Sequence, residues 1–147
     1  MTLSDWAKSG WLVEHKTTPQ EIESILAVGD RNLSDSRAPG LSEDGQFGMA
    51  YNAAVSAAVA ALAAAGYRAP KESHHYRVIQ SLALTIGLDR DSVERMDSFR
   101  KKRNISMYER AGIISGQEVR EITTLAQRLR HDVERWLRET HPDLLRG

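Results

Sequence analysis

The sequence predicts an all-α protein, an antiparallel up-and-down helical bundle with four to five core helices and a short N-terminal helix. Three observations lead to this prediction. Apolar residues recur at three- and four-residue steps along most of the chain, whereas the alternation typical of β-strands is convincing nowhere. Capping residues precede several of these patterns, and glycine or proline follows them. The connections between the patterns are short, which favours antiparallel packing of successive helices.

The first part of the chain contains the short helix and one long helix. We expect Ser4 to cap the short helix, which carries Trp6, Trp11 and Leu12. The long helix begins after Thr18, with proline at its first position and Glu21 placed to complete a capping box. Its predicted buried face consists of Ile22, Ile25, Leu26, Gly29 and Leu33.

An alanine-rich helix follows Ser42 and ends at Gly66. Glu43 and Asp44 lie in its first turn, where carboxylates interact favourably with the helix dipole. Because alanine side chains let helix axes approach closely, we expect this helix to be central and the most enclosed. Its apolar run over residues 53–65 is shorter than the ~20 residues that a membrane span needs, so we expect no membrane association.

Three further helices are predicted in the second half of the chain. Ser73 is expected to cap the first, which ends at Gly87. The second spans residues 89–110, and the third begins at Gly116. The apolar positions of the third helix form a heptad-like seam suited to bundle packing: Val119, Ile122, Ala126, Leu129, Val133 and Trp136.

Length and composition restrict the class of protein. The 147 residues are expected to form one domain, residues 1–147, with its helical core over about residues 18–138. Twenty basic and twenty acidic side chains give no net charge, which excludes a strongly basic nucleic-acid wrapper as a global character. The absence of cysteine excludes disulfides and a cysteine nucleophile. The N-terminal residues do not resemble a signal peptide, so we expect a soluble, cytoplasmic protein.

One helix carries a polar interruption in its apolar stripe. Val93, Met96 and Phe99 recur at three-residue steps, and the next core position falls on Arg103, followed directly by Asn104. A buried guanidinium requires an anion, a carboxylate or a carbonyl group as partner. This requirement is met more easily at a two-fold interface than inside one bundle, so we expect a homodimer.

Two interpretations of this segment are open. In the first, basic residues near the end of a helix complement its dipole and are solvated. In the second, Arg103 clamps a phosphate or carboxylate, Asn104 orients it, and Tyr108 presents its hydroxyl to the same cleft, with Arg100 one turn earlier. The dipole interpretation accounts well for the two intervening lysines and poorly for Arg103, which is in phase with the core.

The segment from Phe99 to Tyr108 resembles the signature of HEPN domains (higher eukaryotes and prokaryotes nucleotide-binding). That signature is an arginine, usually followed by a polar residue such as asparagine, with a histidine four to six residues beyond. Arg103 and Asn104 match it, and tyrosine stands in the histidine position. The segment 47–54 is similar to the first core helix of many bacterial members. The resemblance covers about residues 18–136 and also implies a helical bundle.

The resemblance implies an RNA- or nucleotide-binding homodimer, with Arg103, Asn104 and Tyr108 as catalytic candidates and no metal or cofactor. Members with the full motif are commonly metal-independent endoribonucleases, in which arginine stabilises charge on the phosphorane and histidine moves a proton. Cleavage of toxin or stress-response type and binding without cleavage are both open here. The alternative is a non-catalytic interaction module, either antitoxin-like or the partner of a separately encoded nucleotidyltransferase.

Further binding candidates lie outside the motif helix. Arg100 shares its face, and Asn52 is expected to face Arg103 across the cleft, next to Tyr51. A local interpretation of this pair is also open, with Tyr51 as a core ring and Asn52 as an amide bonded to a neighbouring helix end.

Adjacent histidines stand at a helix start, and we expect His74 and His75 to point to different faces in capping or surface roles. Because no histidine or carboxylate follows at helical spacing, we expect no metal site there. The sequence leaves open that a histidine from another part of the chain completes the cleft.

Overall fold

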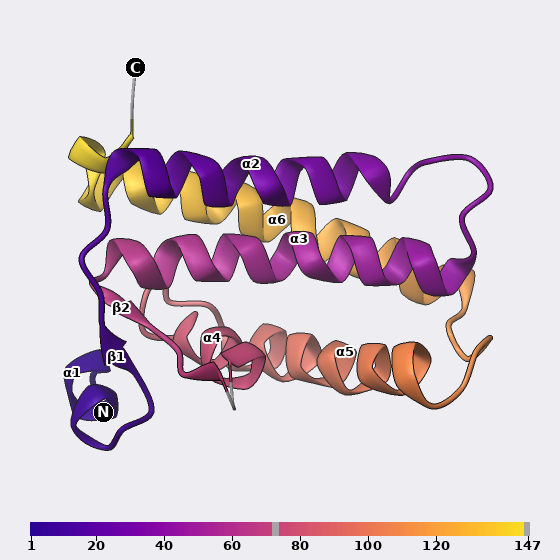
Figure 1. Cartoon of the computed structure of the whole chain (residues 1–147), viewed down its shortest axis with the longest axis horizontal. Helices are drawn as coiled ribbons and strands as arrows, with labels where there is room; N and C mark the ends of the chain where they lie inside the picture. The colour runs from indigo at the N-terminus through magenta and orange to yellow at the C-terminus, as the bar shows by residue number, and fades with distance from the viewer. Residues whose placement is uncertain (72–73, 146–147) are drawn as a thin grey trace.

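The computed structural model describes residues 1–71 and 74–145 and shows a helical bundle, which confirms the predicted fold class (Figure 1). The long helices are α2 (Pro19–Asp35), α3 (Glu43–Ala64), α5 (Arg90–Tyr108) and α6 (Gly116–Thr140). Shorter elements are α1 (Leu3–Lys8), α4 (His74–Ser81) and the 3₁₀ turn η2 (Pro142–Leu144). The four long helices alternate in direction along the chain, as predicted (Figure 1).

Helix α3 is the centre of the bundle, as its alanine content predicts. It packs against α2, α4, α5 and α6, and 14 of its 22 residues are buried. By length and composition alone it could cross a membrane, but 78% of its apolar window is buried among the other helices. Its apolar surface is therefore already covered within the bundle.

Helix α6 packs against α3 and runs in the same direction, so these two neighbours are parallel (Figure 1). The predicted seam is only partly right: Val119 and Trp136 are half-buried, whereas Leu125 and Leu137 are fully enclosed. The buried stripe is wider than a coiled-coil seam because α6 lies on the small side chains of α3. The buried residues of α6 are Ile122, Leu125, Ala126, Leu129, Val133 and Leu137.

The start of α2 matches the prediction except for its capping box. Thr18 Oγ1 accepts a hydrogen bond from the Glu21 amide at 3.2 Å, and Pro19 occupies the first turn. The Glu21 carboxylate does not complete the box. It accepts instead from the Thr17 hydroxyl at 2.7 Å and lies 2.6 Å from His15 Nε2. These contacts, that of Thr17 first, lower the pKa of Glu21.

The N-terminal segment differs from the prediction in three respects. Helix α1 ends at Lys8, so Trp11 and Leu12 lie after it and not within it. Thr2, and not Ser4, caps α1, because Thr2 and Asp5 form a reciprocal capping box. A two-stranded antiparallel sheet, which the sequence did not predict, then joins β1 (Val13–Glu14) to β2 (Tyr67–Arg68). Each strand is only two residues long, too short for an alternating pattern to be visible.

Helix α4 is shorter than predicted, since it ends at Ser81 and not at Gly87. The Ser81 hydroxyl donates to the carbonyl of Val78 at 2.7 Å, and the Thr85 hydroxyl donates to the carbonyl of Ser81 at 3.3 Å. Side chains that bond to nearby carbonyls compete with helical hydrogen bonds, and the chain continues as turns. The expected cap, Ser73, lies outside the described residues.

Helix α5 agrees closely with the predicted range 89–110. Asp89 caps it by accepting from the Ser92 amide at 3.0 Å. Val93, Met96 and Phe99 are buried, as the apolar stripe predicts. The face of α5 that these residues define leads directly to the candidate site.

Candidate functional site

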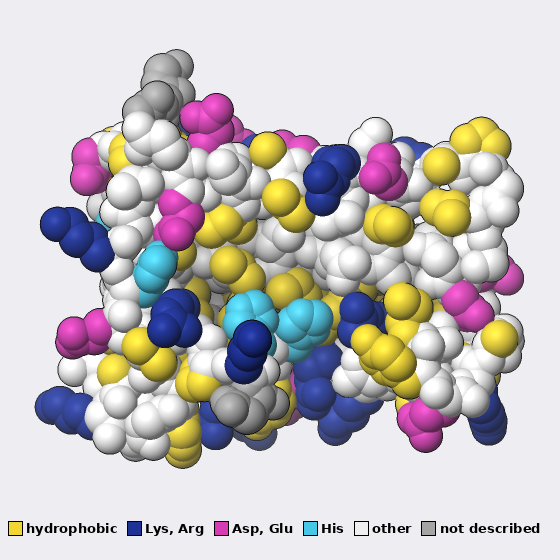
Figure 2. Space-filling view, in the orientation of Figure 1, with side chains coloured by type: hydrophobic (Ala, Val, Ile, Leu, Met, Phe, Trp, Pro, Cys, Tyr) yellow, Lys and Arg dark blue, Asp and Glu magenta, His cyan; other side chains and the backbone are white. Residues whose placement is uncertain are grey.

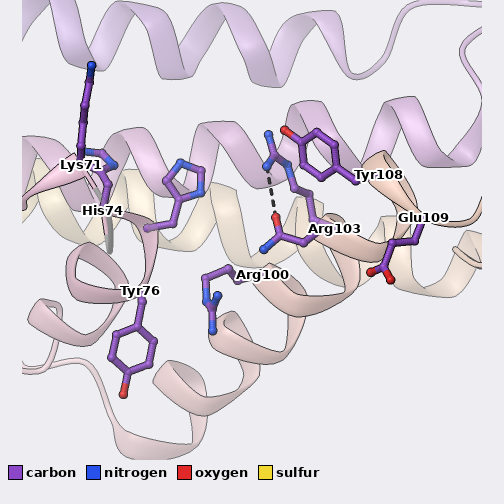
Figure 3. Close-up of a pocket in the computed structure, with 9 residues that line it drawn as sticks. Lys71, His74, Tyr76, Arg100, Arg103, Tyr108 and Glu109 are labelled. Carbon is purple, nitrogen blue, oxygen red and sulfur yellow. Dashed lines mark hydrogen bonds between the residues drawn. The ribbon is translucent and has the colours of Figure 1, made fainter.

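An open cavity of about 770 Å³ lies between α4 and the C-terminal half of α5 (Figure 3). Figure 2 shows histidine and basic side chains gathered on the side of the bundle where these helices meet α3. The predicted residues Arg100, Arg103, Asn104 and Tyr108 all line the cavity. The remaining lining residues are Lys71, His74, His75, Tyr76 and Glu109.

Arg103 is half-buried in the wall of this cavity. Its Nη1 donates to the Asn104 side-chain oxygen at 3.3 Å (Figure 3), and its guanidinium carbon lies 5.6 Å from the centroid of the Tyr51 ring. Its Nε is buried, and within the described part of the chain it has no hydrogen-bond partner. Among the described residues, no carboxylate lies within 4.0 Å of this guanidinium.

The neighbouring basic residues of α5 are paired with carboxylates. Arg100 Nε lies 2.7 Å from Asp97 Oδ1, and Lys101 Nζ lies 3.7 Å from the other oxygen of the same carboxylate. Lys102 forms an ion pair with Glu118 of α6. The interpretation of these residues as solvated charges that complement the helix dipole therefore accounts for Arg100, Lys101 and Lys102. It does not account for Arg103.

Tyr108 is the last residue of α5 and projects over the cavity from its end (Figure 3). It is 76% exposed, and its neighbours Met107 and Ile105 are also exposed, at 52% and 38%. The ring therefore lies at the rim of the cavity, where its face and hydroxyl are both accessible.

Tyr51, and not Asn52, is the α3 residue that lies beneath Arg103. The Tyr51 side chain is fully buried, whereas Asn52 is half-buried and does not line the cavity, so the expectation that Asn52 faces Arg103 is wrong. Consecutive helical residues point about 100° apart, so a helix that directs Tyr51 toward α5 directs Asn52 elsewhere. The Tyr51 hydroxyl lies 3.0 Å from His75 Nδ1.

His74 and His75 are half-buried and both line the cavity, which corrects the expectation of surface roles. The reason is that α4 packs against both α3 and α5, so two sides of this short helix are enclosed. Burial lowers the pKa of both rings, and for His75 burial, with smaller effects of His74, Arg103 and Arg100, lowers it to about 4. Both rings are therefore neutral at pH 7.

The arrangement suits an anion more than a metal ion. A planar guanidinium binds phosphate or carboxylate through parallel hydrogen bonds, and Arg103 is positioned for this contact without a competing carboxylate among the described residues. Within the same residues, no group of three or more histidine, aspartate or glutamate side chains could hold a metal ion.

No protein-family model matches the chain, and no curated protein matches it. The resemblance to HEPN domains therefore rests on the motif residues of α5 and on the start of α3.

Proposed function

We propose that the cavity between α4 and α5 binds a phosphate group of RNA or of a nucleotide, with Arg103 as the phosphate-contacting cation. One observation carries the proposal: Arg103 is a half-buried cation with a buried, unpartnered Nε, and no carboxylate among the described residues neutralises it. Removing such a charge from water is unfavourable unless an anion compensates it. A bound phosphate supplies that anion.

The other predicted residues have supporting roles in this proposal. Asn104 holds the guanidinium through the hydrogen bond from Nη1, and the Tyr51 ring lies beneath it. Tyr108 is exposed at the rim, where an aromatic ring can stack on a base of a single strand. Arg100 adds less net charge because Asp97 already neutralises it.

The resemblance extends the proposal to cleavage of the HEPN type, in a cytoplasmic homodimer with a toxin or stress-response role. In that reaction the ribose 2′-oxygen attacks the adjacent phosphorus and the 5′-oxygen leaves. Arg103 would stabilise the negative charge that develops on the phosphoryl oxygens. Tyr108 is the candidate for the proton transfer that the family assigns to histidine.

A second candidate function is supported by the exposed apolar end of α5. Ile105, Met107 and Tyr108 are all exposed there. Such a surface is typical of a site that contacts another protein. In this alternative the chain is a non-catalytic module that binds a partner, such as a nucleotidyltransferase, or acts as an antitoxin.

Binding and cleavage are tested with the full chain and mixed single-stranded RNA, with and without a chelator. The decisive variant is Arg103→Ala. Its matched control is Lys101→Ala, which removes the same charge two residues earlier from a side chain that does not line the cavity and is 69% exposed. Arg103→Ala removes a charge-assisted contact and should weaken RNA binding at least about 10-fold. Lys101→Ala removes only an exposed charge and should weaken binding less than about 3-fold.

Each outcome has a distinct meaning. Chelator-resistant products that disappear with Arg103→Ala support a metal-independent ribonuclease. Binding without products supports the binding function alone. Equal affinity of the two variants, or no binding by the wild-type chain, contradicts the proposal.

A further inference from the structure

A second polar pair lies against Arg103 and is not part of the α5 motif. It consists of Tyr51 on α3 and His75 on α4, joined by the contact of 3.0 Å between the phenol oxygen and Nδ1. The Tyr51 ring lies under the Arg103 guanidinium, and the His75 ring lines the cavity that this guanidinium also lines. Tyr51 thus touches both candidate ligand-binding groups and is itself fully buried.

The direction of the hydrogen bond follows from the burial of Tyr51. Burial raises the pKa of the Tyr51 phenol, so the group keeps its proton. A buried hydroxyl needs an acceptor for this proton, and His75 Nδ1 is the partner that the structure provides. The phenol therefore donates, and Nδ1 accepts.

This direction determines the state of the rest of the histidine ring. A neutral imidazole carries one proton, so when Nδ1 accepts, the proton is on Nε2. Burial and the nearby arginines keep the ring neutral at pH 7. The edge of the ring opposite Nδ1 therefore offers an N–H donor, with no lone pair available to remove a proton from a ligand.

We propose that His75 is the second phosphate-contacting residue of this site, a neutral Nε2–H donor that Tyr51 holds in position beside Arg103. The inference rests on the proposed function, because the donor needs an anionic acceptor. Tyr51 is a positioning residue that does not touch the ligand. In this arrangement His75 binds a phosphate oxygen and does not act as a general base.

The first test needs no ligand. Two-bond ¹⁵N–¹H correlation spectra of the full chain at neutral pH distinguish the two neutral tautomers of histidine, and His75→Asn identifies the His75 signals by their absence. We expect a protonated Nε2 and an unprotonated Nδ1, and we expect Tyr51→Phe to shift the ring toward a mixture of tautomers. A protonated Nδ1 in the wild-type chain would overturn the proposal.

The second test measures affinity for a short, fluorescein-labelled single-stranded oligouridine. His75→Gln places an amide donor near the position of Nε2, whereas His75→Asn places it near Nδ1. We expect about a 5-fold loss of affinity with Asn, and recovery to within about 2-fold of wild type with Gln, because a neutral hydrogen bond is involved. Tyr51→Phe should lower the affinity for the oligouridine about 2- to 3-fold. His131→Gln, an exposed histidine on α6, is the control.

The two proposals fail in different ways. If Arg103→Ala weakens binding and His75→Asn binds like wild type, the role of His75 is refuted and the phosphate site stands. If Asn and Gln weaken binding equally, the side chain acts through packing and the donor role is refuted. If the wild-type chain binds no oligouridine, both proposals are refuted.

Discussion

Replacing Arg103 with methionine should stabilise the protein and abolish phosphate binding. Methionine has an unbranched side chain that ends about where Nε of Arg103 lies and a similar helix propensity, so the change keeps the apolar stem and removes the guanidinium group with its charge and hydrogen bonds. The Nε of Arg103, which is buried and has no partner among the described residues, costs about 1–3 kcal/mol of stability. In a protein that binds no anion at this position, that cost is present in every folded molecule.

Two contacts offset part of this cost. The guanidinium over the Tyr51 ring contributes about 0.5–1 kcal/mol at 5.6 Å, and the long hydrogen bond of 3.3 Å to Asn104 contributes about 0.5 kcal/mol. The difference predicts a net gain of about 1 kcal/mol for Arg103→Met. For a domain of this size that gain raises the melting temperature by about 3 °C.

Thermal and urea unfolding followed by circular dichroism measure this effect, in parallel with RNA binding. Lys102→Met is the control, because it breaks the ion pair with Glu118 and should lower stability by less than about 1 kcal/mol without weakening binding. A melting temperature of Arg103→Met below that of wild type would refute the reasoning. It would mean that the guanidinium is satisfied within the fold and needs no ligand.

Three further predictions concern stability and are measured by urea unfolding. A Cβ on Gly29 would lie 3.0 Å from Ser56 Cβ, so Gly29→Ala should lower the free energy of unfolding by about 1 kcal/mol after its gain in helix propensity. A Cβ on Gly48 would meet only the Met107 sulfur, at 3.8 Å, so Gly48→Ala should raise the free energy of unfolding by up to about 1 kcal/mol. Equal effects of the two substitutions would contradict the close α2–α3 packing. Ser115→Ala removes the cap of α6 and should lose about 1 kcal/mol, and an unchanged stability would show that the cap is dispensable. The pKa of His75 is near 6.5 in the unfolded chain and about 4 in the folded chain, so the stability of the wild-type chain falls as the pH drops through this window. Over the same window the His75→Gln variant should lose about 1–2 kcal/mol less stability than wild type, after allowance for the partial exposure of the ring. Parallel pH profiles of the two proteins would contradict this prediction.

Local signals in the sequence were sufficient for most helix boundaries. Each long helix is capped in the structure by a side-chain oxygen, from Thr18, Ser42, Asp89 and Ser115. The sequence predicted Thr18 and Ser42 as caps and residue 89 as the start of a helix. Such signals act over three or four residues, so they are visible without the fold. Where a second local interaction competes, as at Ser81, the boundary was placed wrongly.

The candidate site was predicted in part for the same reason. Arg103 interrupts an apolar stripe within one helix, and a single-helix pattern reveals it. His75 is different, because its position depends on how α4 packs against α3 and α5. The choice between Tyr51 and Asn52 likewise depends on the rotation of α3, and an alanine-rich helix with apolar residues on all sides gives no periodic signal for that rotation.

The small β1–β2 sheet makes the cavity sensitive to residues far from it. β1 binds the segment that leads into α4, and the guanidinium of Arg77 on α4 lies 4.0 Å from the centre of the Trp11 ring. Residues 1–16 therefore support the helix that carries His75, although none of them lines the cavity. A shortened chain that lacks them would keep Arg103 on α5 and could still lose ligand affinity, so ligand measurements need the complete N-terminal segment.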